Sequence, residues 1–256
     1  MHTPLRRRLV SLAAAMLAAG AGSAAAAGSN LFAAKAASCA RGDHPETALQ
    51  GQVPAALRAA GFTGFNCNLT LIGQLPGEGG NWSAATFKSG NRTCAYYATD
   101  LATPARKVPG VPVIEIDAAG HPMYKTSLTT PAMMDPWESL RVHTPRKLLI
   151  ADNGRGGPEV DLYDLSVDCA APQLLASIPV GTGNDGGIKL ALAPMGHEGN
   201  LSPDGRTYYI GDPGRGAYHA VDITNPSKPK LIASVTFAEV GLKSRIRHGL
   251  SVSTDG

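Results

Sequence analysis

The chain has 256 residues, with 23 Lys and Arg against 20 Asp and Glu and a formal charge of +3. Arg6, Arg7 and Arg8 account for the whole excess, so the rest of the chain is neutral by formal count. A neutral chain argues against nucleic-acid binding, which needs a basic face, and 43% hydrophobic residues argue against a disordered chain.

The first residues have the pattern of an export signal. The three arginines precede a short apolar run over 9–19, and small residues continue to Ala27. A basic start, an apolar run and a small-residue end predict a secretory signal peptide over 1–27. The apolar run is shorter than the roughly 20 residues that span a bilayer, so no transmembrane segment is expected after the signal is removed. The sequence leaves the general secretory and twin-arginine routes open, and it indicates export to the periplasm, the cell surface or the extracellular space.

Four cysteines follow the predicted signal, which suits an oxidising compartment. None lies in a C-x-x-C pair, so the sequence does not support a zinc or thioredoxin-like site. Four cysteines allow three pairings, and the sequence does not choose among them. We therefore expect one or two structural disulfides among Cys39, Cys67, Cys94 and Cys169.

Residues 28–65 are interpreted as a leader that precedes the repeated part of the chain. Within it, residues 53–61 predict a short helix, because Pro54 suits a first helical turn and Gly61 suits the position after the last one. The alternative for this region is a leader without fixed structure.

From about residue 66 the sequence repeats itself. Asp117, Asp164 and Asp222 each end a short apolar run, in steps of 47 (117 to 164) and 58 (164 to 222). Residues 148–156 match residues 208–216 at a constant offset of 60 (208 less 148). The recurring Asp side chains are expected to accept hydrogen bonds from nearby turn amides, which is a structural role.

Each repeat reads as four short strands joined by tight turns rich in Gly, Pro, Asp and Asn. Four strands in a period near 50 residues predict a blade of a β-propeller. A β-sandwich would not repeat its turn residues at fixed offsets, and the units of a β-solenoid are usually shorter.

The predicted fold is therefore all-β: an incomplete β-propeller over 66–256, with about three four-stranded blades and a closing strand. The blades are expected near 81–130, 137–180 and 197–240, and a fourth begins near 248. The segment 67–75 has the character of the closing strand. Because a closed ring needs at least about four blades, the chain is interpreted as the front part of a longer protein; the alternative is a short form that assembles from several chains.

Two stretches resemble known exported propellers. Residues 221–232, Val-Asp-Ile-Thr-Asn-Pro-Ser-Lys-Pro-Lys-Leu-Ile, resemble the LVIVD-repeat family, and residues 202–209, Ser-Pro-Asp-Gly-Arg-Thr-Tyr-Tyr, resemble the related YVTN-type propellers. The resemblance covers roughly 66–256 and implies the propeller fold. It implies no catalytic residues, because propellers host enzymes, receptors and scaffolds alike.

Three residues at the starts of blades are the candidate binding residues. His197 and Glu198 open one predicted blade, and His248 opens the next. Such positions line the channel mouth of a propeller, and imidazole and carboxylate groups are good ligands for zinc or iron. Because Gly79 and Trp137 occupy this slot in the earlier blades, a packing or hydrogen-bonding role is the preferred interpretation.

No other motif points to a reaction or identifies a cofactor. The glycine-rich segment 181–187 lacks the Lys-Ser/Thr ending of a phosphate-binding loop. The sequence therefore favours a non-catalytic binding or interaction module of the cell envelope, whose partner is an unidentified envelope protein or surface ligand. The alternative is a metal-assisted hydrolase or lactonase with its site at the channel mouth.

Overall fold

The computed structural model describes residues 38–45, 55–60, 64–99, 106–154, 159–180, 196–214, 216–241 and 249–255. It divides into two units, Met1–Thr70 and Leu71–Gly256. The predicted signal peptide, the glycine-rich segment 181–187 and His248 lie outside the described residues.

The described part of the first unit is small and held by a covalent bond. A disulfide joins Cys39 to Cys67, and one short helix, α2 (Ala55–Ala59), lies inside the range expected to be helical. The backbone amide of Asn66 donates to the carbonyl of His44 at 2.9 Å, so the segments on either side of α2 are bonded to each other.

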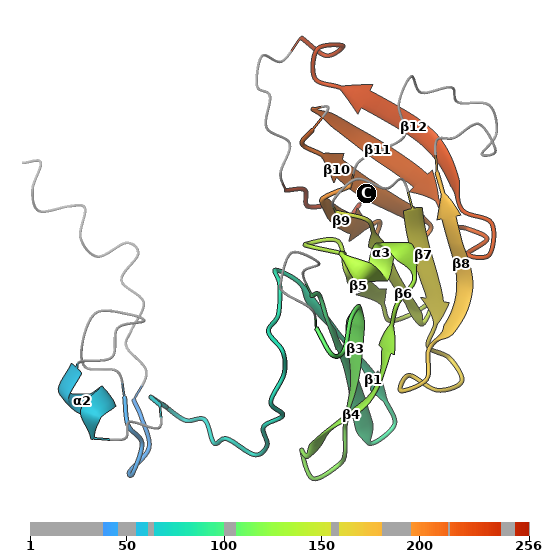
Figure 1. The fold of residues 1–256 in the computed structure, drawn as a ribbon. Coiled ribbons are helices and arrows are strands. Elements are labelled where there is room, and N and C mark those ends of the chain that lie inside the picture. Colours follow the sequence, from blue (N-terminus) through green and yellow to red (C-terminus); the bar gives the residue numbers. More distant parts are fainter. Residues whose placement is uncertain are drawn as a thin grey trace, which may run out of the picture. The chain divides into compact units, whose positions relative to one another are not determined.

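The second unit contains three four-stranded antiparallel sheets (Figure 1). In every sheet the strands follow one another in chain order, as expected of strands joined by hairpin turns. The prediction of an all-β fold built from propeller-like blades is confirmed. The first blade consists of β1 (Ala84–Ser89), β2 (Arg92–Tyr97), β3 (Val111–Ile116) and β4 (Pro122–Leu128), the second of β5 (Arg141–His143), β6 (Leu148–Asp152), β7 (Glu159–Asp164) and β8 (Gln173–Pro179), and the third of β9 (Glu198–Leu201), β10 (Thr207–Asp212), β11 (Ala217–Asp222) and β12 (Lys230–Thr236).

The repeated sequence produces repeated local structure. The recurring aspartate directly follows the third strand in the first blade and ends it in the other two. Its Oδ1 accepts the backbone amide two residues further on, at 2.9 Å for Asp117 and 2.8 Å for Asp164 and Asp222. The predicted turn role of these residues is confirmed. All three blades also carry a register shift between the third and fourth strands.

Apolar cores lie between neighbouring blades, and the second blade contributes to both of them. Every residue of β6 is buried. Leu149 belongs to the cluster shared with the first blade, whereas Ile150 belongs to the cluster shared with the third. Successive side chains of a strand point to opposite faces, so a fully apolar strand is expected where both faces of a sheet are covered.

The first and second blades are also joined by covalent and polar bonds. A disulfide links Cys94 in β2 to Cys169 in the turn before β8. The hydroxyl of Tyr96 donates to the carbonyl of Cys169 at 2.7 Å, and Arg92 pairs with Asp168 at 2.7 Å. The prediction of one or two structural disulfides is therefore confirmed with two, and the structure supplies their pairing.

The expected closing strand is not formed. The described residues between α2 and β1 contain no strand, and the side chains of Leu69, Leu71 and Ile72 are exposed. A Cβ atom at Gly73 would stand 2.5 Å from the carbonyl oxygen of Gly120, so this part of the segment lies against the turn before β4 without pairing as a strand. Its role in closing a ring stays a prediction.

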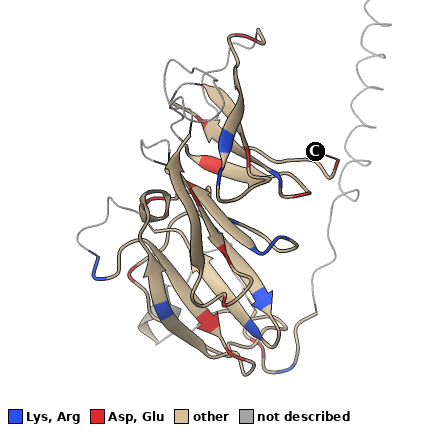
Figure 2. Cartoon of the chain, turned by 90° about the vertical axis from the view of Figure 1, so that its right-hand side faces the viewer, with Lys and Arg blue, Asp and Glu red and all other residues tan. Residues whose placement is uncertain are grey.

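Figure 2 shows basic and acidic residues interspersed over the described blades. No helix in the described part of the chain has the length and apolar character needed to cross a membrane. The structure also includes a four-residue helix, α3 (Pro131–Met134), between the first and second blades.

Candidate functional site

The inner strands of neighbouring blades start side by side. β1 lies next to β5, and β5 lies next to β9. Glu138, just before β5, forms a parallel bridge with Glu198, the first residue of β9, and its backbone amide donates to the carbonyl of His197 at 3.3 Å. This arrangement brings the polar residues that precede and open these strands to one place.

Glu138 and His197 form a half-buried pair across the two blades. Nδ1 of His197 lies 3.4 Å from Oε2 of Glu138, and these side chains are 14% and 19% exposed, respectively. The imidazole also stands edge-on to the indole of Trp137, with 4.6 Å between ring centroids. The histidine is therefore positioned on two sides, by a carboxylate and by an aromatic ring.

Arg141 and Glu198 form a second pair beside the first. Nη2 of Arg141 lies 3.6 Å from Oε1 of Glu198, with the side chains 27% and 19% exposed. The backbone of Gly249 lies close to the same carboxylate, since a Cβ atom at position 249 would stand 2.7 Å from Oε2 of Glu198. Both pairs combine one carboxylate with a group that is or can become cationic.

Glu138, Arg141 and Glu198 border an open cavity of about 410 Å³, which we name the inner cleft. Trp82 lies at its rim with 73% of its surface exposed. Ser83 is fixed in place, because its hydroxyl donates to the carbonyl of Trp137 at 2.5 Å. The residues that line the inner cleft are Trp82, Ser83, Ala84, Glu138, Arg141 and Glu198.

A buried acid lies next to the inner cleft. Asp152 is fully buried, which raises its pKa to about 7, and its Oδ2 accepts the hydroxyl of Tyr208 at 2.9 Å. Its backbone amide donates to the hydroxyl of Ser139 at 3.0 Å, directly after Glu138 in the chain. Burial together with the adjacent Asp152 raises the pKa of Tyr208 as well.

The sequence located part of this site. Glu198 lines the inner cleft, His197 contacts it through Glu138, and His248 lies outside the described residues. The sequence analysis missed Glu138 and Arg141. A signal for Glu138 was present, because the constant offset of 60 residues places it in the slot of Glu198 (138 plus 60). No comparable signal marks Arg141.

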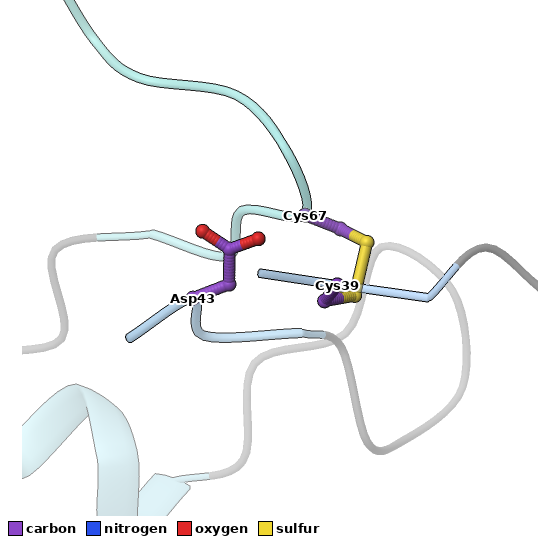
Figure 3. A group of neighbouring side chains, drawn as sticks. All are labelled: Cys39, Asp43 and Cys67. Carbon is purple, nitrogen blue, oxygen red and sulfur yellow. A yellow bond between two sulfur atoms is a disulfide. The ribbon is translucent and has the colours of Figure 1, made fainter. Parts of the chain in front are cut away.

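One group of three potential metal ligands is present among the described residues: Cys39, Asp43 and Cys67 (Figure 3). Both sulfur atoms belong to the disulfide and so are not thiolates. The carboxylate of Asp43 accepts hydrogen bonds from the amides of Ala40 and Asn68 at 2.9 and 2.6 Å. The donor set therefore fits a disulfide-bonded turn and not a metal ion.

The chain is similar to solved structures at low sequence identity. No family model matches the sequence, and no curated protein matches it. The periplasmic gluconolactonase of Pseudomonas aeruginosa is similar in structure, at 18% identity and a TM-score of 0.47, over 67% of this chain and 47% of that one. A 6-phosphogluconolactonase-like protein of Bacteroides fragilis is similar at 10% identity and a TM-score of 0.43, over 58% of this chain and 37% of that one. The chain thus spans less than half of either protein.

These similarities correct one expectation. The sequence analysis favoured a non-catalytic binding or interaction module, whereas the similar solved structures include a gluconolactonase and a 6-phosphogluconolactonase-like protein. A non-catalytic module is therefore not retained. The sequence analysis reached the wrong preference because it found no catalytic motif, although the inner cleft gathers its polar residues from separate blades.

Proposed function

We propose that the inner cleft hydrolyses a lactone or a related ester. The observation that carries the proposal is the half-buried pair of Glu138 and His197, 3.4 Å apart, with Glu138 lining the same cavity as Arg141. A carboxylate at a cavity wall can act as a general base, and a nearby guanidinium can stabilise negative charge on a reacting oxygen.

In this mechanism Glu138 removes a proton from a water molecule, whose oxygen then bonds to the ester carbonyl carbon. Arg141 stabilises the negative charge that develops on the carbonyl oxygen. When the carbon–oxygen bond of the ring breaks, the protonated Glu138 returns its proton to the leaving oxygen. The product is a hydroxy acid, which releases its own proton to solvent. His197 orients the Glu138 carboxylate, and Glu198 holds Arg141.

A metal-assisted form of the reaction is the alternative. Glu138 and His197 offer a carboxylate and an imidazole as neighbouring donors, and a metal ion would supply an activated water molecule. In the described part of the chain no group of three such ligands includes these residues. His248, the further donor suggested by the sequence, would have to complete the set.

The test is hydrolysis of a panel of aldonolactones and simple lactones, followed by the acid released. Glu138→Gln should lower kcat/KM by about 100-fold or more, because general-base catalysis typically contributes that much. Glu239→Gln, which changes an exposed turn carboxylate in the third blade, is the matched control and should not alter the rate. Rates that survive a chelator support Glu138 acting directly on water. Chelator-sensitive rates that zinc restores support the metal-assisted alternative.

We further propose that the mature chain is exported after removal of residues 1–27 and belongs to the LVIVD-repeat propellers. The two disulfides support export, because such bonds persist in oxidising compartments. N-terminal sequencing of the protein from a periplasmic fraction tests the predicted cleavage. A mature chain that begins at its original methionine would refute it.

A further inference from the structure

The third blade contains a Ser–His–Asp network that is separate from the inner cleft. Nδ1 of His219 lies 2.7 Å from the hydroxyl oxygen of Ser234, and Nε2 lies 3.3 Å from Oδ2 of Asp212. The three residues come from three neighbouring strands, β12, β11 and β10. The imidazole is therefore placed between a hydroxyl and a carboxylate.

The three groups differ in their access to solvent. Asp212 is fully buried and His219 is 3% exposed, whereas Ser234 is only partly buried. The acid and the base are thus shielded from water, and the serine is the most exposed of the three residues. An activated nucleophile has this order: a hydroxyl, a base within hydrogen-bonding reach and a third group that orients the base.

The second blade shows that the fold does not require this network. His219 pairs with Ser234 across the third and fourth strands, and the corresponding pair in the second blade is Asp161 with Ser177. There the carboxylate accepts two backbone amides from α3, at 2.8 and 3.1 Å. A blade of the same register therefore forms without a histidine at this position.

The carboxylates at the ends of the second strands differ in the same way. Asp152 in the second blade and Asp212 in the third are related by the offset of 60 residues (212 less 152). Asp152 bonds to the hydroxyl of Tyr208, whereas Asp212 pairs with His219 inside its own blade. The network thus departs from the repeat in residue type at one position, His219, while Asp212 and Ser234 keep the residue types of Asp152 and Ser177.

We propose that Ser234, activated by His219 and Asp212, is the nucleophile of a second, serine-dependent ester-cleaving site. Its hydroxyl oxygen would bond to the carbonyl carbon of a small ester while its proton passes to Nδ1 of His219. The bond to the leaving alcohol breaks as that proton is transferred to the departing oxygen, leaving an acyl group on Ser234. A water molecule then attacks the acyl carbon while His219 takes its proton. The bond to the serine oxygen breaks as that proton passes to it, which releases the free acid and regenerates Ser234.

The surroundings of Ser234 indicate the class of substrate. β12 is the last strand of its sheet in the described part of the chain, and an edge strand presents backbone amides that could stabilise an oxyanion. Ile232, two residues before Ser234 on the same strand, is 48% exposed. The site therefore suits an ester with a short apolar acyl group and not a highly charged one.

The test is covalent labelling of the full chain by a fluorophosphonate probe, with mass spectrometry to locate the modified residue. We expect one label, on Ser234. Ser234→Ala should abolish the label, and His219→Gln should slow it by about 100-fold. Ser177→Ala is the matched control, because it removes the corresponding hydroxyl from the second blade, and it should label normally.

Two results would overturn the proposal: no labelling of the unaltered chain, or labelling that persists in Ser234→Ala. The unaltered chain provides the first result without any variant, so a folding defect cannot obscure it. Glu138→Gln should retain the label on Ser234, and Ser234→Ala should retain hydrolysis at the inner cleft. Failure of this proposal and failure of the proposed function are therefore distinguishable.

Discussion

Replacement of the buried Asp152 by Asn should remove a pH dependence from the stability of the protein. Burial raises the pKa of Asp152 to about 7 from the ordinary value of 3.8 for an aspartate. Between these two values the folded chain keeps a proton that the unfolded chain has lost, so the free energy of unfolding falls as pH rises. The difference of about 3 pKa units, at about 1.4 kcal/mol each, corresponds to about 4 kcal/mol. Above about pH 7 the folded chain has lost the proton as well, so the free energy of unfolding falls no further on account of Asp152.

The assay is urea unfolding of the unaltered chain and of Asp152→Asn between pH 4 and pH 8 at constant ionic strength. Asp117, Asp204 and Asp222 have lowered pKa values because turn hydrogen bonds favour their charged forms, so they act in the opposite direction. These three aspartates are present in both proteins, so their effects cancel in the difference between the two free energies of unfolding. Asp152→Asn should gain stability relative to the unaltered chain as pH rises. Parallel stability curves for the two proteins would refute the reasoning.

Three further predictions follow from contacts between and beside the blades. Gly249→Ala should weaken lactone hydrolysis, because the new Cβ would stand 2.7 Å from Oε2 of Glu198 and displace that carboxylate; unchanged kcat/KM would contradict this. Tyr208→Phe should lower the free energy of unfolding by about 1–3 kcal/mol, measured by urea unfolding, because Asp152 and a carbonyl lose their hydroxyl partner. Removing the Cys94–Cys169 disulfide, which closes a separation of 75 residues, should cost about 4 kcal/mol on the chain-entropy account. Removing the Cys39–Cys67 disulfide, with a separation of 28, should cost less, and the reverse order in thermal unfolding would contradict the assignment.

The fold was predictable because its determinants are local and repeated. Turn residues recur at fixed offsets, and each recurring aspartate accepts an amide in its own turn. The segment 67–75 was predicted as a strand from its composition alone, but strand formation also depends on a partner edge, which composition does not supply. Cysteine pairing was equally out of reach, because Cys94 and Cys169 meet only when two blades pack together.

The candidate site was predictable only in part. His197 and Glu198 were found because they open a blade, and this position is visible in the repeat. Arg141 lies at the start of a three-residue strand, and its relation to Glu198 depends on how β5 packs beside β9. The network of the third blade was missed because His219 replaces the Asp161 of the second blade, and its approach to Ser234 and Asp212 depends on strand pairing.

Departures from the repeat are therefore more informative about chemistry than the repeat itself. Residues that recur in every blade, such as the turn aspartates, form the same bond each time and are explained by the fold. Glu138 and Glu198 share a slot, but one pairs with His197 and the other with Arg141, so the same position supports two electrostatic environments. Asp152 and Asp212 likewise share a slot and have a tyrosine or a histidine as partner. A scaffold that tolerates such exchanges without changing its strands can place acids, bases and cations around one cleft while the apolar cores between its blades are kept.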